Sequence, residues 1–316
     1  MMLPFIRVAD IQLGPLPIHT FGLLVATGVI LGTSLTLRRA RERGLDVDAL
    51  NSFITWMLVC GFVIAHVFND VFYEWKVVKE DPLRLLRIWE SISSFGGFLG
   101  GFIGVMAWKY FEAVPWFKVL PGLTMHKLRL RKKPVPVFPF CDLILSVFPV
   151  AWIFGRAGCT TAHDHIGAVA PQGTAIAVEA PYEDFHKLMG RYEGPPWIKF
   201  EHGPFARYDL GLLEFLFTIG LSAFIVLTWR RKLPTGTYVA VTCLAYAPVR
   251  YVMDAFRLSE NDNRFADRTP AQWMCIALFA AGLVAAYAAY KYGKSGKDPM
   301  EVFRLSDEER RAQQPG

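Results

Sequence analysis

Seven long apolar stretches dominate the sequence and restrict the folds that it can adopt. They lie near residues 18–37, 52–73, 93–112, 138–157, 211–229, 236–256 and 271–290. An α-helix rises about 1.5 Å per residue, so about 20 apolar residues cross a hydrocarbon core of about 30 Å. Hydrophobic residues make up 53% of the chain, more than is usual for a soluble protein. The sequence therefore predicts an all-α, polytopic membrane protein with seven transmembrane helices.

Clusters of lysine and arginine indicate how these helices are oriented. They follow the first, third, fifth and seventh stretch, as RRARER, HKLRLRKKP, RRK and KYGKSGK. Cytoplasmic connections carry such an excess of basic residues, so we expect the N-terminus outside and the C-terminus in the cytoplasm. The net charge of +6 does not indicate a nucleic-acid partner, because the basic residues lie in short clusters between apolar stretches and not along one face. The expected surroundings are a lipid bilayer.

The longest connection divides the predicted domain organisation. Residues 158–210 are rich in glycine, proline and aromatic side chains, which favours a folded outer cap over a solvated linker. We expect residues 1–300 to form one transmembrane domain that includes this cap, and residues 301–316 to form a frayed cytoplasmic tail. The five cysteines are scattered and form no metal-binding pattern, so neither a cofactor nor a metal is predicted.

Four polar residues share one face of the sixth apolar stretch. Tyr246, Arg250, Asp254 and Arg257 are spaced by four, four and three residues. A charged residue at the bilayer centre costs about 2.5–3.5 kcal/mol, so such residues need partners or water. One interpretation is a functional site; the other is an intrahelical ion pair of Arg250 with Asp254 near the membrane interface.

The stretch GRAGCTTAHDHIG, residues 155–167, ends the fourth apolar segment with several reactive side chains. Arg156 brings a second arginine toward the outer surface. Two guanidinium groups, here Arg156 and Arg250, suit the phosphate of a lipid headgroup because each offers a planar fork of donors. The alternative is that Arg156 only anchors a helix end in the headgroup layer. Cys159 is either a nucleophile or, as we prefer, an inert buried thiol.

His163, Asp164 and His165 form a candidate proton-transfer set within the same stretch. Histidine titrates near neutral pH, and an adjacent carboxylate can orient and charge it. A metal site is a weaker interpretation, because only the distant His186 and His202 could complete the ligands. An ordinary polar loop is the third alternative.

Two lone acids and a row of glycines complete the candidate residues. Asp142 and Glu214 lie within apolar stretches, where we expect them to face the interior and to pair with the arginines. Gly96, Gly100 and Gly104 recur every four residues, as do Gly97 and Gly101. Such a smooth strip admits either another helix or a lipid, and the two interpretations are compatible.

With these residues in view, the chain resembles the bacterial prolipoprotein diacylglyceryl transferases. The signature of that family reads roughly GRxGNFxNxExxG, and this chain keeps Gly155, Arg156, Gly158 and Gly167. The segment YAPVRYVMDAFR is similar to the family's Tyr-x-x-x-Arg followed by an acid and another arginine. PIHTFGLL with RRARERG, and DPLRLLRIWE, resemble its first span and second loop.

The resemblance implies an enzyme of the bacterial inner membrane. It would transfer a diacylglyceryl group from phosphatidylglycerol to the lipobox cysteine thiol in the signal peptide of a preprolipoprotein, releasing glycerol phosphate. Arg156 and Arg250 would bind the phosphate, with Tyr246 as a supporting donor. The residues expected to contribute to substrate binding are Gly96, Gly97, Asp142, Glu214, Asp254 and Arg257.

Several polar residues of the family pattern are replaced in this chain. Phe95 stands where the family has a histidine, and the signature positions Cys159, Ala162 and Asp164 also differ, as do Phe21 and His66. We hypothesise that His163 or His165, oriented by Asp164, replaces the lost base. A relative that binds phospholipid or lipoprotein without transfer is the second hypothesis. A proton-coupled transporter using His66, Asp70, Asp142 and Glu214 is disfavoured, because no inverted repeat is visible.

Overall fold

The computed structural model describes most of the chain as two compact units. Described are residues 2–6, 8, 11–13, 16–72, 74–87, 92–120, 123–162, 166–171, 173–180, 205–256, 266–306 and 308–309. Unit 1 comprises Met1–Thr36 and Asp142–Pro299, and unit 2 comprises Leu37–Cys141 and Met300–Gly316. The predicted division into a transmembrane domain and a tail at residue 300 stays a prediction.

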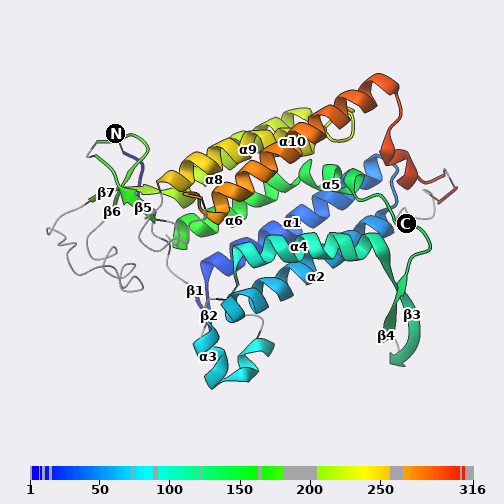
Figure 1. Ribbon diagram of the computed structural model, residues 1–316, viewed down its shortest axis with the longest axis horizontal. Coiled ribbons are helices and arrows are strands. Elements are labelled where there is room, and N and C mark those ends of the chain that lie inside the picture. Colours follow the sequence, from blue (N-terminus) through cyan, green and yellow to red (C-terminus); the bar gives the residue numbers. More distant parts are fainter. Residues whose placement is uncertain are drawn as a thin grey trace. The chain divides into compact units, whose positions relative to one another are not determined.

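Helices account for most of the described residues (Figure 1). Their bounds are α1 Thr20–Glu42, α2 Val47–Phe72, α3 Trp75–Glu80, η1 Pro82–Leu86, α4 Ser94–Tyr110, α5 Phe138–Leu145, α6 Phe148–Ala162, α8 Leu210–Thr228, α9 Thr237–Ala255, α10 Pro270–Ser295 and η3 Pro299–Phe303. Each of the seven predicted stretches coincides with at least one of the longer helices. The prediction of a polytopic membrane protein is thus confirmed at this level.

Four or five of these helices are long and apolar enough to cross a membrane. In the described part of the chain these are α1, α2, α8 and α10, and the pair α5–α6 is a fifth candidate. The seven predicted spans are therefore not all confirmed: α4 has only 17 residues, and α9 carries a buried Asp254 as well as an internal proline. The predicted span 138–157 is bent by 58° between α5 and α6. Pro149, the second residue of α6, cannot continue a preceding helix and accounts for the break.

Three small antiparallel sheets correct the prediction of an all-α fold. Strands β1 (Ile11–Leu13) and β2 (Leu16–Ile18) form one, and β3 (Phe111–Leu120) and β4 (Leu123–Leu130) form a longer hairpin. Strands β5 (Ile166–Val169), β6 (Val178–Ala180) and β7 (Phe205–Asp209) pair in the order β5-β7-β6. Within this last sheet Arg207 donates to Gly167 O at 3.0 Å, and burial lowers the pKa of Arg207 to about 10, so it stays charged at neutral pH.

In unit 2, the glycine strip of α4 packs directly on α2. A Cβ atom on Gly96 would lie 2.7 Å from Phe68 Cβ, and one on Gly100 would lie 2.4 Å from Cys60 O. Only glycine permits this approach, so helix packing explains the four-residue repeat of these glycines. The roles of Gly96 and Gly97 in substrate binding stay predictions.

The start of the predicted tail also packs within unit 2. Phe303 at the end of η3 is buried and stacks on Phe140 with ring centroids 4.0 Å apart. Phe140 in turn contacts Phe53 and Trp108, whose rings complete an aromatic cluster. Residues 301–303 are therefore not frayed, because an aromatic anchor holds them to the helices.

Asp142 has a structural task in unit 1. Its Oδ1 atom accepts hydrogen bonds from the backbone N–H groups of Tyr238, at 2.9 Å, and Val239, at 3.0 Å. These groups belong to the first turn of α9, where backbone donors lack partners within the helix. Asp142 thus satisfies two backbone donors at the start of α9, and its predicted pairing with an arginine stays a prediction.

Candidate functional site

A buried carboxylate joins three helices of unit 1. Glu214 on α8 accepts a hydrogen bond from Tyr246 Oη on α9, and its Oε1 atom lies 3.0 Å from Arg156 Nη2 on α6. The side chain of Glu214 is only 2% exposed and that of Arg156 11% exposed. The expected pairing of Glu214 with an arginine is confirmed. The pairing compensates a charge that would otherwise be costly among apolar helices.

Arg156 also contacts its own helix. Its guanidinium carbon lies 4.7 Å from the centroid of the Trp152 ring, and Nη1 lies 3.8 Å from Cys159 Sγ. The aromatic face of Trp152 attracts the cation and limits the rotamers of Arg156. Its Nε atom is buried and has no hydrogen-bond partner among the described residues. One donor of the guanidinium is therefore unpaired among the described residues, while Glu214 and Trp152 hold the side chain.

A second arginine lies one helical turn beyond Tyr246. Arg250 Nη2 is 3.6 Å from Asp254 Oδ1, so the predicted intrahelical pair is present. The other carboxylate oxygen of Asp254 accepts a hydrogen bond from the hydroxyl of Thr269, the N-cap residue of α10. Thr269 and Gln272 form a capping box, with both hydrogen bonds at 3.1 Å. The orientation of Arg250 thus depends, through Asp254, on the start of the next helix.

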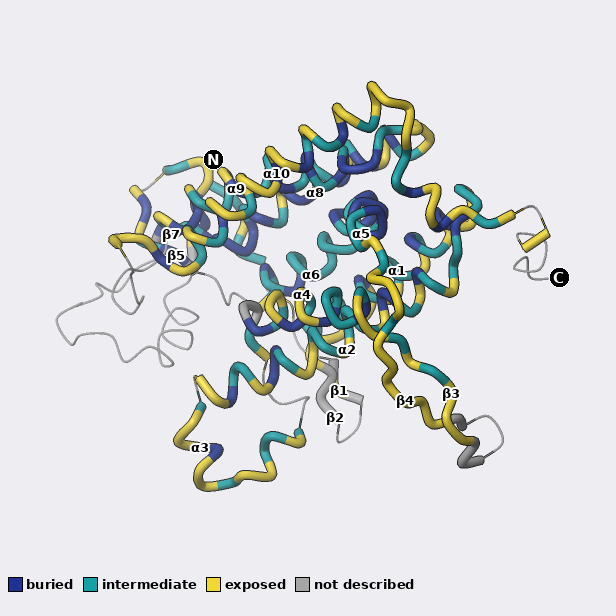
Figure 2. The backbone as a smooth tube through the Cα atoms, turned by 45° about the vertical axis from the view of Figure 1, so that its right-hand side comes forward, coloured by how far each residue is buried: buried dark blue, intermediate teal, exposed yellow. Residues whose placement is uncertain are grey.

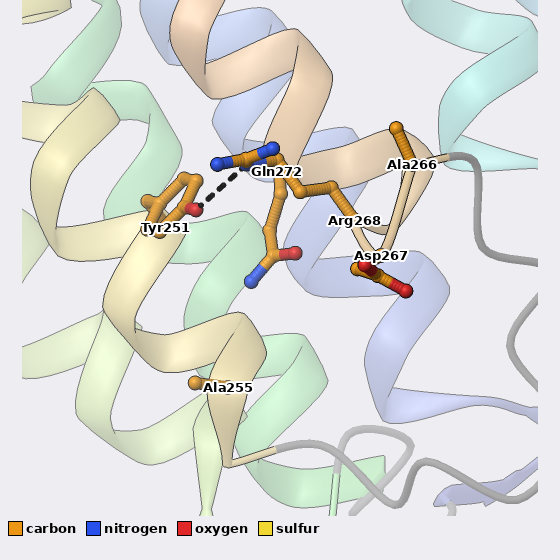
Figure 3. A pocket seen from close by; sticks show the side chains of 6 residues that line it. All are labelled: Tyr251, Ala255, Ala266, Asp267, Arg268 and Gln272. Carbon is orange, nitrogen blue, oxygen red and sulfur yellow. Dashed lines mark hydrogen bonds between the residues drawn. The ribbon is translucent and has the colours of Figure 1, made fainter.

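A polar pocket of about 360 Å³ opens between the end of α9 and the start of α10 (Figure 3). Tyr251 and Ala255 line it from α9, Gln272 from α10, and Ala266, Asp267 and Arg268 from the segment that precedes α10. Arg268 Nε donates to Tyr251 Oη at 3.2 Å, the dashed line in Figure 3. The pocket is next in sequence to the Arg250–Asp254 pair, because Ala255 follows Asp254 and Gln272 belongs to the capping box that orients Asp254.

Unit 2 contains a separate buried group of ionisable residues. His66 Nε2 lies 3.5 Å from Asp70 Oδ2 and 3.2 Å from the backbone oxygen of Arg84, and the side chains of His66 and Asp70 are fully buried. Arg84 Nε lies 3.4 Å from the same carboxylate oxygen. His66, which differs from the family pattern, is thus held by neighbours within its own unit.

The predicted site residues differ in what can be said of them. Arg156, Glu214 and Tyr246 meet at one carboxylate, and Arg250 pairs with Asp254. His163, Asp164, His165 and Arg257 lie outside the described residues. Thr269 and Trp152 were missed. The pattern Thr-x-x-Gln before an apolar run is a sequence signal for a capping box and could have identified Thr269, whereas no sequence signal indicates the contact of Trp152 with Arg156.

These features define a multi-pass membrane protein with arginine–carboxylate pairs buried among its apolar helices. The comparisons with known proteins are specific. The family model for prolipoprotein diacylglyceryl transferase matches residues 8–126 and 119–288, and the chain belongs to this family.

Curated relatives cover nearly the whole chain. The phosphatidylglycerol–prolipoprotein diacylglyceryl transferase of Symbiobacterium thermophilum is 23% identical over 284 residues, which is 90% of this chain and 92% of the relative. The protein of the same name from Psychrobacter arcticus is 26% identical over 294 residues, covering 90% and 93%. That of Staphylococcus xylosus is 29% identical over 285 residues, or 89% of each chain.

Proposed function

We propose that this protein transfers a diacylglyceryl group from phosphatidylglycerol to the lipobox cysteine of a preprolipoprotein signal peptide. Membership of the family supports the reaction. The observation that carries the assignment to this site is the buried Arg156, whose charge Glu214 compensates and whose Nε atom has no hydrogen-bond partner among the described residues. Arginines that serve only as headgroup anchors extend toward the membrane surface and do not need a buried carboxylate.

The reaction needs little covalent chemistry from the enzyme. The thiolate of the substrate attacks the glyceryl carbon that carries the phosphate, a C–S bond forms, and the C–O bond to the phosphate breaks. Glycerol phosphate leaves with the electron pair, and the thiol proton goes to a base. Arg156 and Arg250 bind the phosphate and stabilise the developing charge, with Tyr246 as a supporting donor. Such preorganised electrostatic stabilisation is often the largest catalytic contribution.

The base is the part of the proposal that is particular to this chain. Phe95 cannot take a proton, and His163 and His165 flank Asp164 in the signature stretch. We assign the base to one of these histidines, oriented by the aspartate. Transfer rates in membranes carrying His163→Ala, His165→Ala or both test this assignment. A large loss in the double variant is expected, and undiminished rates in all three would refute it.

The topology follows from the same proposal. We place the protein in the bacterial inner membrane with seven spans, the N-terminus outside and the C-terminus in the cytoplasm. The alternating lysine and arginine clusters support this orientation. Reporter fusions after residues 232 and 297 should be active only with a cytoplasmic reporter. Activity of a periplasmic reporter at either position would contradict the orientation.

Complementation tests the reaction itself. The chain is expressed in a bacterium depleted of its own transferase, and lipidation is followed by the mobility shift of a lipoprotein. Rescue is expected, together with its loss in Arg250→Ala. A matched control is Arg230→Ala, which removes an arginine from the predicted cytoplasmic cluster and should still rescue. Stable membrane expression without rescue would instead favour a relative that binds phospholipid or lipoprotein without transfer, as the replacement of the family histidine by Phe95 suggests.

A further inference from the structure

The β3–β4 hairpin of unit 2 has no part in the proposed reaction. β3 begins at Phe111, directly after the last residue of the apolar helix α4. Arg131 joins the base of the hairpin to this helix: its backbone N–H donates to Tyr110 O at 2.8 Å, and its Nε donates to Trp108 O at 3.1 Å. The base of the hairpin is therefore joined to the end of α4.

The register of the two strands gives the hairpin two different faces. Residues opposite each other in an antiparallel pair share a face, and successive residues alternate between faces. One face is apolar and the other charged, with the pairs Phe111–Leu130 and Ala113–Leu128 on the first and Glu112–Arg129 and Val114–Lys127 on the second. The hairpin is therefore amphipathic.

The apolar face is open. Leu128 and Leu130 are 64% and 65% exposed. On the opposite face Lys127 and Arg129 are exposed as well, whereas Glu112 and Val114 are half-buried. Beyond the bulge after Pro115, Trp116 adds a further exposed aromatic ring. Figure 2 shows much of both strands in yellow, the colour of exposed residues. An isolated two-stranded hairpin is only marginally stable in water, so this face requires a covering surface.

The charge of the hairpin indicates what that surface is. Its strands and their flanks carry seven basic residues against the single acid Glu112: Lys109, Lys118, Lys127, Arg129, Arg131, Lys132 and Lys133. Glu112 is itself compensated by Arg129 at 2.7 Å. A preprotein's basic n-region would be repelled, whereas anionic lipid headgroups would be attracted. Direct continuity with α4 places the hairpin at the end of an apolar helix, where headgroups are expected.

We propose that the β3–β4 hairpin lies on the anionic membrane surface, with Phe111, Leu128 and Leu130 inserted at the acyl boundary and its basic residues on lipid phosphates. Amphipathic helices bind membranes by the same combination of buried apolar area and basic charge. In the hairpin, the alternation of side chains along the strands would separate the apolar from the basic residues, as the helical period does in an amphipathic helix.

Hydrogen exchange of the full-length protein tests the lipid dependence. The protein is placed in nanodiscs of phosphatidylcholine alone or with 30% phosphatidylglycerol, and exchange is followed in peptides covering residues 111–130. We expect exchange to slow at least about fivefold in the anionic discs. A fivefold change corresponds to the attraction of about one lysine or arginine to an anionic membrane surface. High salt should reverse the effect, because it screens exposed charges. Equal exchange in both lipids would overturn the proposal.

Two matched substitutions separate the faces of the hairpin. Leu128→Glu places a carboxylate on the apolar face and should abolish the slow exchange, whereas Val114→Glu places the same group opposite Lys127 on the charged face and should preserve it. Faster exchange in α2 and α4 would show that Leu128→Glu disturbs the fold of unit 2. In that case the double variant Lys132→Glu/Lys133→Glu, whose changes lie outside the strands, replaces it. This double variant should remove the lipid dependence. An unchanged exchange pattern in that variant, or slow exchange in neutral detergent, would show that protein packing covers the face.

Discussion

Replacing Glu214 by glutamine is the sharpest test of the arginine–carboxylate cluster. The side chain keeps its shape and one carbonyl oxygen, but it loses the charge that compensates Arg156 at 3.0 Å. The carbonyl oxygen can still accept from Tyr246 or from Arg156. The substitution therefore leaves a nearly buried guanidinium without its counterion while disturbing the packing of α6, α8 and α9 very little.

The expected loss of stability follows from the geometry. Unit charges at 3.0 Å attract each other by about 5 kcal/mol at an effective dielectric constant of about 20. Removing one partner of a buried pair costs about 3–5 kcal/mol, because the remaining charge stays desolvated. Tyr246→Phe removes only one hydrogen bond to the carboxylate and should cost about 1.5–3 kcal/mol. Glu214→Gln should therefore be the more destabilising of the two.

A double-mutant cycle measures whether the three residues act together. The free energy of unfolding is determined by titration with SDS in mixed micelles for the wild type, both single variants and the double variant. Because Tyr246 and Arg156 share one oxygen of Glu214, we expect a coupling energy of at least about 0.5 kcal/mol between the substitutions. A Glu214→Gln variant as stable as the wild type would refute the assigned ion pair with Arg156, and strict additivity would refute the contact between Tyr246 and Glu214.

Two further predictions concern helix contacts. Thr269→Val keeps the volume of the side chain but loses the hydrogen bond to Asp254 and the cap of α10. We expect the unfolding free energy to fall by about 2–3 kcal/mol and the KM for phosphatidylglycerol to rise, and we expect Thr269→Ser to restore both. Equal behaviour of the two variants would contradict the positioning of Arg250 through Asp254. Gly100→Ala should lower the thermal unfolding temperature, because the added Cβ would lie 2.4 Å from Cys60 O. Gly101→Ala is the control and should leave that temperature unchanged, because its Cβ would lie 3.8 Å from the nearest atom. Equal shifts in the two variants would refute the packing of α4 on α2.

The sequence predicted where the helices lie, but it predicted neither the break between α5 and α6 nor the strands that connect the helices. Apolar length is a local property, so each long stretch corresponds to a helix. The bend before Pro149 was missed, because the apolar run is long enough for one straight span. The β3–β4 hairpin was missed because the basic residues of β4 indicated a cytoplasmic connection, and such charge clusters do not specify secondary structure.

For the candidate site, spacing along one helix was informative and contacts between helices were not. The four-residue spacing placed Tyr246, Arg250 and Asp254 on one face, because helical periodicity determines it. The pairing of Arg156 with Glu214 was expected in general terms, since a buried charge needs a partner. The role of Asp142 at the start of α9 depends on the packing of distant segments, and no local pattern encodes it.

The two arginines are compensated in different ways, and this has a consequence for ligand binding. Arg156 is held by a carboxylate from another helix, whereas Arg250 is held by Asp254 on its own helix, which Thr269 of the next helix orients in turn. Both guanidinium groups are therefore paired before any anion arrives, as insertion among apolar helices requires. A guanidinium offers five donors, so a phosphate can bind to those that remain without breaking either pair. Because the carboxylates also reduce the net positive charge, the anionic product of the proposed reaction would bind less tightly than it would to two uncompensated arginines, and its release would be correspondingly easier.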